Sequence, residues 1–149
     1  LPSDARPTAI AAYLAESAHD LSAAQQSEIG GEVLAVLNHS DFAHLFGPGS
    51  RAEVPIVGDV GTFEPCVISG QVDRLLATDT TVTIVDFKTN RSPPKEEADV
   101  PRVYLRQMAA YRAALRQIYP DHVILSVMLW TDGPQLMRLS NLILDPHTP

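Results

Sequence analysis

The chain has 149 residues, of which 45% are hydrophobic, and it carries a formal net charge of −7. This length and apolar content suit one domain with a single core, and no apolar run approaches the roughly 18 residues of a membrane span. The one cysteine, Cys66, excludes an internal disulfide framework and a four-cysteine zinc or iron–sulfur site. We therefore expect Cys66 to be a small buried strand residue in a protein of the reducing cytoplasm.

The charge is unevenly distributed along the chain. Residues 1–73 hold two Lys/Arg against ten Asp/Glu, a balance of −8, and residues 117–149 add −2. Residues 74–116 reverse the sign with eight Lys/Arg against five Asp/Glu, a balance of +3. A net acidic chain does not favour a free-standing nucleic-acid binder, because phosphate contacts need lysine and arginine. The basic middle segment instead suggests a module whose nucleic-acid path is partly supplied by other protein.

Helices are expected before the first strand. Residues 1–6 read as a linker, and the pattern TAIAAYLAES predicts a helix over residues 7–17, with proline tolerated in its first turn. Ser22 and Gln25 match a capping box that opens a second helix ending near Leu37. Residues 41–45 suggest a short helical turn before a glycine–proline loop.

Strands follow in the middle of the chain. RAEVPIVG (51–58) reads as a strand, and its proline, Pro55, favours an edge or irregular position. Residues 67–90, VISGQVDRLLATDTTVTIVDFKTN, read as two strands joined by a polar turn at Thr78–Thr80. The pattern therefore predicts an antiparallel hairpin in the centre of the domain.

The last third returns to a helix and then to strands. Residues 90–100 predict an exposed, mobile loop, and a helix is expected from about Pro101 to Tyr119. HVILSVMLWT (122–131) reads as a buried strand, and residues 135–139 as another, with the tail NLILDPHTP as an added edge strand. This order of elements predicts an α/β domain with a mixed central β-sheet flanked by helices.

The hairpin carries the residues with the clearest chemistry. Side chains alternate across a strand, so Asp86 and Lys88 share one face, and antiparallel pairing would bring Asp73 beside Asp86. Such a group suits metal-dependent phosphodiester hydrolysis, since Mg²⁺ binds few carboxylates with several waters. Asp73, Asp86 and the backbone carbonyl of Phe87 would be the ligands. The alternative is a hairpin whose polar residues face solvent or pair with each other.

Three motifs around this spacing resemble a known nuclease family. They are Gly70-Gln71-Val72-Asp73-Arg74, Asp86-Phe87-Lys88-Thr89 and Gln107-Met108-Ala109-Ala110-Tyr111. In this order they resemble the RecB-like nuclease family of the PD-(D/E)XK superfamily, whose core is restriction-endonuclease-like. The resemblance is closest to the carboxy-terminal nuclease domain of AddA-type subunits of bacterial AddAB helicase–nucleases, over roughly residues 50–140.

The resemblance implies a role for each motif residue. Asp73 and Asp86 would ligate metal and Lys88 would be catalytic. Gln107 and Tyr111, at i and i+4 on one helix face, would support the site or contact DNA. The alternatives are a core tyrosine and a glutamine that caps a backbone group. Supporting or DNA-contacting roles are also implied for Glu53, Arg74 and Thr89, although Glu53 reads equally well as an exposed strand glutamate and Arg74 as an ordinary surface charge.

One family feature is missing. Members carry a histidine in a glycine–x–x–His context on a helix before the hairpin, and none of the five histidines here has that context. We therefore expect residues 1–149 to be a single nuclease domain, with a helical lead-in (1–46) and a core (51–140), cut from a larger chain after the histidine. Such a fragment would bind metal weakly and have little or no activity.

The function implied by the resemblance is Mg²⁺-dependent DNA hydrolysis in double-strand-break repair. Mn²⁺ would substitute for Mg²⁺, and ATP would act only at a motor domain elsewhere, since this chain has no glycine-rich phosphate loop. The partners would be DNA, the rest of an AddA chain and an AddB-type subunit, with no membrane. The alternative is a catalytically silent nuclease fold that guides DNA.

Overall fold

The computed structural model describes residues 2–16, 19–61, 64 and 66–149. In chain order the elements are α1 (Arg6–Leu14), α2 (Ala23–Asn38), the 3₁₀ helix η2 (Ala43–Phe46), β1 (Ser50–Asp59), β2 (Val67–Ala77), β3 (Thr81–Lys88), the 3₁₀ helix η3 (Glu97–Asp99), α3 (Arg102–Ile118), β4 (Val123–Trp130), β5 (Gln135–Leu139), α4 (Asn141–Leu144) and the 3₁₀ helix η4 (Asp145–His147). Within the described part of the chain, no helix has the length and apolar character that crossing a membrane requires.

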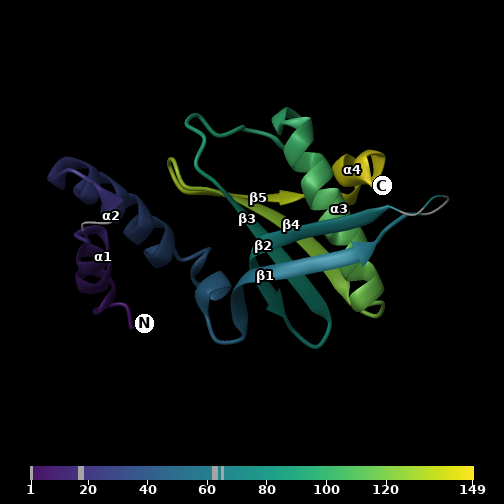
Figure 1. Ribbon diagram of the computed structural model, residues 1–149, viewed down its shortest axis with the longest axis horizontal. Helices are drawn as coiled ribbons and strands as arrows, with labels where there is room; N and C mark the ends of the chain where they lie inside the picture. Colours follow the sequence, from purple (N-terminus) through teal and green to yellow (C-terminus); the bar gives the residue numbers. More distant parts are fainter. Residues whose placement is uncertain (1, 17–18, 62–63, 65) are drawn as a thin grey trace.

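The strands form one mixed sheet in the order β1-β2-β3-β4-β5. β1–β2, β2–β3 and β4–β5 pair antiparallel, whereas β3 and β4 are parallel and are connected through α3. β1 lies at the edge, where the missing N–H of Pro55 is tolerated. The predicted α/β class with a mixed sheet is confirmed (Figure 1).

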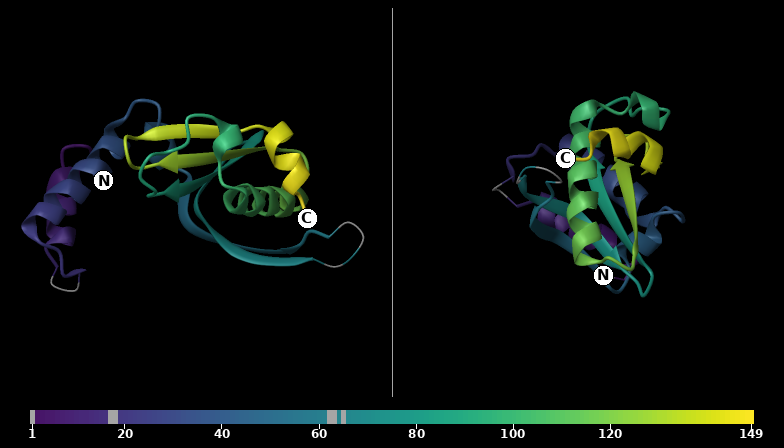
Figure 2. Two further views of the ribbon diagram at one scale, coloured as in Figure 1. Left: turned by 90° about the horizontal axis from the view of Figure 1, so that it is seen from above. Right: turned by 90° about the vertical axis from the view of Figure 1, so that its right-hand side faces the viewer.

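The sheet is bent rather than flat. Seen from above, β1 and β2 curve away from the other three strands and pass beneath α3, which therefore lies between the two parts (Figure 2). Val72 and Leu75 of β2 both pack in the core cluster that includes α3, although residues three apart in a regular strand point to opposite faces. The alternation breaks opposite Glu53, whose φ of 53° is unusual for a residue in a strand.

Two apolar clusters lie on the two faces of the sheet. The larger is the core between α3 and the strands, and includes Ile84, Met108 and Met128. The smaller lies on the opposite face beneath α2 and η2, and includes Val85 and Leu129. The two faces of β3 and β4 are therefore buried against different helices.

The helical lead-in begins and ends close to the predicted positions. Both hydrogen bonds of the capping box between Ser22 and Gln25 are present at the start of α2. Gly30, an unfavourable residue inside a helix, faces α1: a Cβ there would lie 3.5 Å from the side chain of Ile10. The glycine therefore permits close packing of the two helices. α1 ends at Leu14, and the predicted helix end at Ser17 lies outside the described residues.

The tail was predicted as an edge strand, and this is wrong. Ser140 caps α4 by accepting a hydrogen bond from the Ile143 N–H, at 3.3 Å. Its own N–H and hydroxyl donate to the carboxylate of Glu97, at 2.7 and 2.8 Å. Arg112 of α3, which is 1% exposed, donates to Asn141 and Asp145 and holds α4 and η4 against α3. These contacts favour a helix over a sixth strand.

The loop predicted to be mobile is tied to the rest of the molecule. Besides Glu97, the backbone of Ser92 donates to Asp132 at 3.0 Å, and the carbonyl of Pro94 accepts from Gln135 at 3.2 Å. Ser92 and Glu96 are nevertheless exposed, as expected. The turn at the tip of β4–β5 therefore positions the loop that follows β3.

Candidate active site

The two aspartates meet where β2 and β3 separate. The β2–β3 ladder runs from Ala77–Val82 to Arg74–Val85 and stops there. One step further along, the carboxylate of Asp73 accepts a hydrogen bond from the N–H of Phe87, at 2.6 Å. This side chain replaces the backbone acceptor that a continued ladder would have supplied. The expected proximity of Asp73 to Asp86 follows from this strand fork.

Asp86 is buried and is paired with the lysine two residues later. The residue is 3% exposed, and one of its side-chain oxygens forms an ion pair with the ammonium of Lys88. That ammonium also donates to the side-chain oxygen of Gln107 at 3.4 Å, and lies 4.3 Å from the ring centroid of Tyr104. Residues of β3 and α3 thus hold the lysine from two sides.

Burial raises the pKa of Asp86 above its ordinary value. The hydrogen bond and the charge of Lys88 oppose this rise in pKa, and the nearby charge of Asp73 adds to it. Asp86 is therefore paired with Lys88, and Asp73, which accepts from the Phe87 N–H, lies close enough to act on its charge. A further cation at the fork would stabilise both in the charged form.

Tyr111 joins α3 to β2. Its hydroxyl donates to the carbonyl of Gln71 at 3.1 Å, and accepts from the Gln71 N–H and from the Gln107 side chain, both at 3.3 Å. These three bonds use the whole hydrogen-bonding capacity of a hydroxyl. A Cβ at Gly70 would lie 2.5 Å from the Tyr111 oxygen, so only glycine permits this approach. Gln107 links this junction to Lys88.

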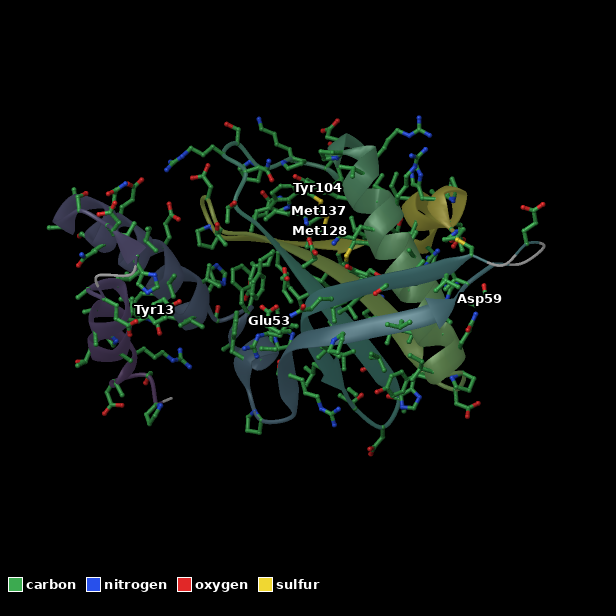
Figure 3. The ribbon with its side chains drawn as sticks, viewed as in Figure 1. Tyr13, Glu53, Asp59, Tyr104, Met128 and Met137 are labelled. Carbon is green, nitrogen blue, oxygen red and sulfur yellow. The ribbon has the colours of Figure 1, made fainter. Side chains whose placement is uncertain are left out.

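Glu53 and Arg74 do not join the cluster of Asp86 and Lys88. Glu53 is exposed near the start of β1, and its carboxylate accepts a hydrogen bond from Gln71 (Figure 3). Arg74 donates to the hydroxyl of Ser50 at 2.9 Å, and its guanidinium lies 4.8 Å from the ring of Phe46. Arg74 thus anchors η2 to the sheet on the face opposite α3. Thr89 is exposed just after β3.

A comparison with family models identifies the superfamily to which the chain belongs. The model of the PD-(D/E)XK nuclease superfamily matches residues 3–135, which is most of the chain. The chain belongs to this superfamily. Membership implies nuclease activity, a hydrolase reaction on nucleic acid, and superfamily members generally use divalent metal ions.

Other comparisons add little. A search of the curated proteins found no match to the chain. A solved structure titled "Crystal structure of SSO0001" is similar at 13% identity with a TM-score of 0.42. The similar region covers 80% of this chain and 64% of that one, so the chain spans less than two thirds of that structure.

The donor set at the strand fork is small but suited to a hard divalent cation. Across residues 2–16, 19–61, 64 and 66–149, no group of three or more His, Cys, Asp or Glu is placed to hold a metal. The fork offers the two carboxylates of Asp73 and Asp86. Because the N–H and C=O of an extended residue point to the same side of a strand, the carbonyl of Phe87 faces the same gap as its N–H. Magnesium is commonly held by one or two carboxylates and several waters, so these oxygens fit it.

The sequence motifs did not indicate Tyr104. It lies three residues before Gln107 and seven before Tyr111, so the three side chains share one face of α3. Its hydroxyl donates to Asn90 at 3.0 Å, and its ring contacts Lys88 as described above. Its helical spacing from Gln107 and Tyr111 was the only signal in the sequence that could have identified Tyr104.

Proposed function

We propose that this chain is the metal-dependent nuclease domain of an AddA-type helicase–nuclease, and that it hydrolyses phosphodiester bonds of one DNA strand during double-strand-break repair. The observation that carries the proposal is the group at the strand fork, in which Asp73 accepts from the Phe87 N–H and the buried Asp86 pairs with Lys88. The flanking motif residues support it, because Gly70 and Tyr111 have a specific packing role beside this group.

In this proposal each residue has a distinct task. Asp73, Asp86 and the Phe87 carbonyl would hold Mg²⁺, or Mn²⁺ in its place, and the bound ion lowers the pKa of a water and polarises the phosphate. Lys88 places a positive charge beside the phosphate oxygens where negative charge develops. Gln107 and Tyr104 fix the ammonium of Lys88, so little reorganisation is needed when substrate binds.

The charge distribution supports a larger assembly. The basic excess lies in residues 74–116, which include Asp86, Lys88 and α3, whereas the rest of the chain is acidic. Long-range attraction of DNA would then depend on other polypeptide, for which we propose the remainder of an AddA chain and an AddB-type subunit, acting in the bacterial cytoplasm. ATP would be used at a motor domain outside this chain.

Lys88→Ala in the full-length protein tests the proposal. Cleavage of a labelled DNA strand with Mg²⁺ is expected to fall by about 100- to 10,000-fold, while DNA binding is retained. The matched control is Lys95→Ala, which removes the other lysine of the chain, an exposed one. Unchanged cleavage by the Lys88 variant would refute a catalytic site and favour a nuclease fold that only guides DNA.

A further inference from the structure

A cavity lies beside Tyr104, the residue whose ring contacts Lys88. Its volume is about 350 Å³, and its lining includes Asn90, Pro94, Asp99, Pro101, Tyr104 and Trp130. The Tyr104 ring is 4.3 Å from the Lys88 ammonium and 6.2 Å from the ring of Trp130. Trp130 is also the β4 partner of Lys88 in the parallel ladder. Tyr104 therefore borders this cavity and also contacts the proposed catalytic lysine.

The wall of the cavity is held in place from several directions. Asn90 accepts the hydroxyl proton of Tyr104 at 3.0 Å, and the loop after it is bonded to the β4–β5 turn through Ser92 and Pro94. Ser92 has a φ of 61°, in the left-handed region that costs free energy for a residue with a side chain. The surrounding contacts maintain this conformation. The cavity is therefore formed before any ligand binds, which lowers the ordering cost of binding.

The lining suits a flat aromatic ligand with polar edges. The ring of Tyr104 and two prolines provide apolar walls, and the carboxylate of Asp99 stands at an exposed position. The oxygen of Asn90 is used by Tyr104, which leaves its amide NH₂ to donate to a ligand. Each nucleobase presents a π-face for stacking and an edge with donors and acceptors.

We propose that this cavity, the base pocket, binds one unstacked nucleobase of the DNA strand whose phosphate lies at Asp73, Asp86 and Lys88. The inference rests on the proposed nuclease function and specifies its substrate. A base that is paired and stacked in a duplex cannot enter the pocket, so the site takes a single strand or a locally opened one. Stacking on Tyr104 tolerates any base, because every base has a π-face.

The test uses single-stranded oligonucleotides with 2-aminopurine at one position in each, mixed with the chain in EDTA so that no cleavage occurs. Emission of 2-aminopurine falls when the base stacks, and we expect quenching at a single position along the bound strand. Tyr104→Leu should remove this quenching and weaken binding about 5- to 100-fold, the value of one base–aromatic stack. Tyr104→Phe, which keeps the ring, should retain both.

Tyr13→Leu is the matched control, because Tyr13 is 60% exposed on α1 and lies far from Tyr104 (Figure 3). This variant should bind and quench as the unsubstituted chain does. Asp99→Ala alters an exposed pocket residue without threatening the fold, and should weaken binding of the quenched strand about 3-fold or more, as expected for the loss of a polar base contact.

The outcomes separate the two proposals. Equal emission at every position, or quenching that survives Tyr104→Leu, would overturn the base pocket even if the full-length protein cleaves DNA with Mg²⁺. Position-specific quenching in a protein whose cleavage is unaffected by Lys88→Ala would support the base pocket and refute the catalytic proposal. Thermal melts of each variant distinguish loss of the pocket from loss of the fold.

Discussion

The two faces of the sheet differ in how tightly they are covered by helices and in the charged groups that they bury. On the face covered by α3, the core is continuous from Ile84 and Met128 to the buried carboxylate of Asp86. On the opposite face, the smaller cluster beneath α2 and η2 leaves an apolar groove of about 460 Å³, lined by residues that include Val33, Phe87 and Leu129. Consecutive residues of one strand, Asp86 and Phe87, therefore belong to different environments.

The difference shows what a tightly packed helix contributes to a site of this kind. α3 excludes water from Asp86, which raises its pKa, and places Gln107 and Tyr104 against Lys88. The groove on the other face is lined mostly by apolar residues, together with the charged Glu32, Arg91 and Asp132. The charged groups of the candidate active site lie on the face of the sheet that α3 covers.

The largest expected effect comes from truncating neighbouring residues that point to opposite faces. Met128 and Leu129 are both 0% exposed on β4, but only Leu129 borders the groove. Met128→Ala should lower the free energy of unfolding by about 3–5 kcal/mol, and Leu129→Ala by about 2–3 kcal/mol, because a site beside open space relaxes more completely. Urea denaturation measures both values. Equal losses would show that the two faces are equally rigid.

Gly70→Ala should disturb the contact between α3 and β2. The added methyl would lie 2.5 Å from the Tyr111 oxygen, so the free energy of unfolding should fall by about 1–3 kcal/mol through overpacking. Gly31→Ala is the matched control: nothing lies within 4 Å of its added Cβ in α2, and the change should stabilise the helix by up to about 1 kcal/mol. Thermal denaturation of both variants checks the opposite signs.

Lys88→Met should tighten binding of a divalent ion while removing cleavage. The ammonium pairs with an oxygen of Asp86 that a metal would need, so its loss leaves two carboxylates without a nearby positive charge. We expect Mn²⁺ affinity to rise about 3- to 10-fold, on the order of 1 kcal/mol of Coulomb energy, with no change for Lys95→Met. Calorimetric titration measures it. Weaker binding would mean that Lys88 supports the metal site rather than competes with it.

The smallest expected effect is on the pH dependence of stability. Since the folded-state pKa of Asp86 is raised above 3.8, its favourable contribution is complete below that value and is lost as pH rises through the folded-state pKa. The free energy of unfolding of the wild-type chain should therefore fall over this window relative to that of Asp86→Asn. Urea denaturation of both proteins in EDTA, from about pH 3.5, near the ordinary pKa of a carboxyl group, to about pH 8, checks this expectation. A wild-type free energy of unfolding that rises with pH relative to that of Asp86→Asn would contradict a raised pKa of this carboxyl.

Local patterns explain which elements the sequence could predict. The capping box at Ser22 and Gln25 needs residues only three apart, and it opens α2 as expected. The turn at Thr78–Thr80 is likewise held by bonds between Thr78 and Thr81. Because side chains alternate along β3, Asp86 and Lys88 lie on one face, and the antiparallel pairing of β2 with β3 brings Asp73 close to them.

Long-range contacts decided the features that the sequence patterns did not predict, namely the conformation of the tail and the direction of Arg74. The tail became α4 because Glu97 and Arg112, 29 or more residues away in the chain, bind its first turn. Arg74 faces away from α3, toward Ser50 and Phe46. Neither outcome follows from hydrophobic periodicity, because the structural preference of a few residues is weak and is easily overridden by tertiary partners.

The sequence by itself determined the sheet and the identity of the charged residues, because side-chain periodicity and short motifs depend on neighbours along the chain. Tertiary structure alone decided that Gly70 accommodates Tyr111, that Tyr104 contacts Lys88, and that a cavity opens behind it. These features depend on how closely α3 approaches β2 and β3. That separation is set by the packing of the whole core and has no signature in any single segment.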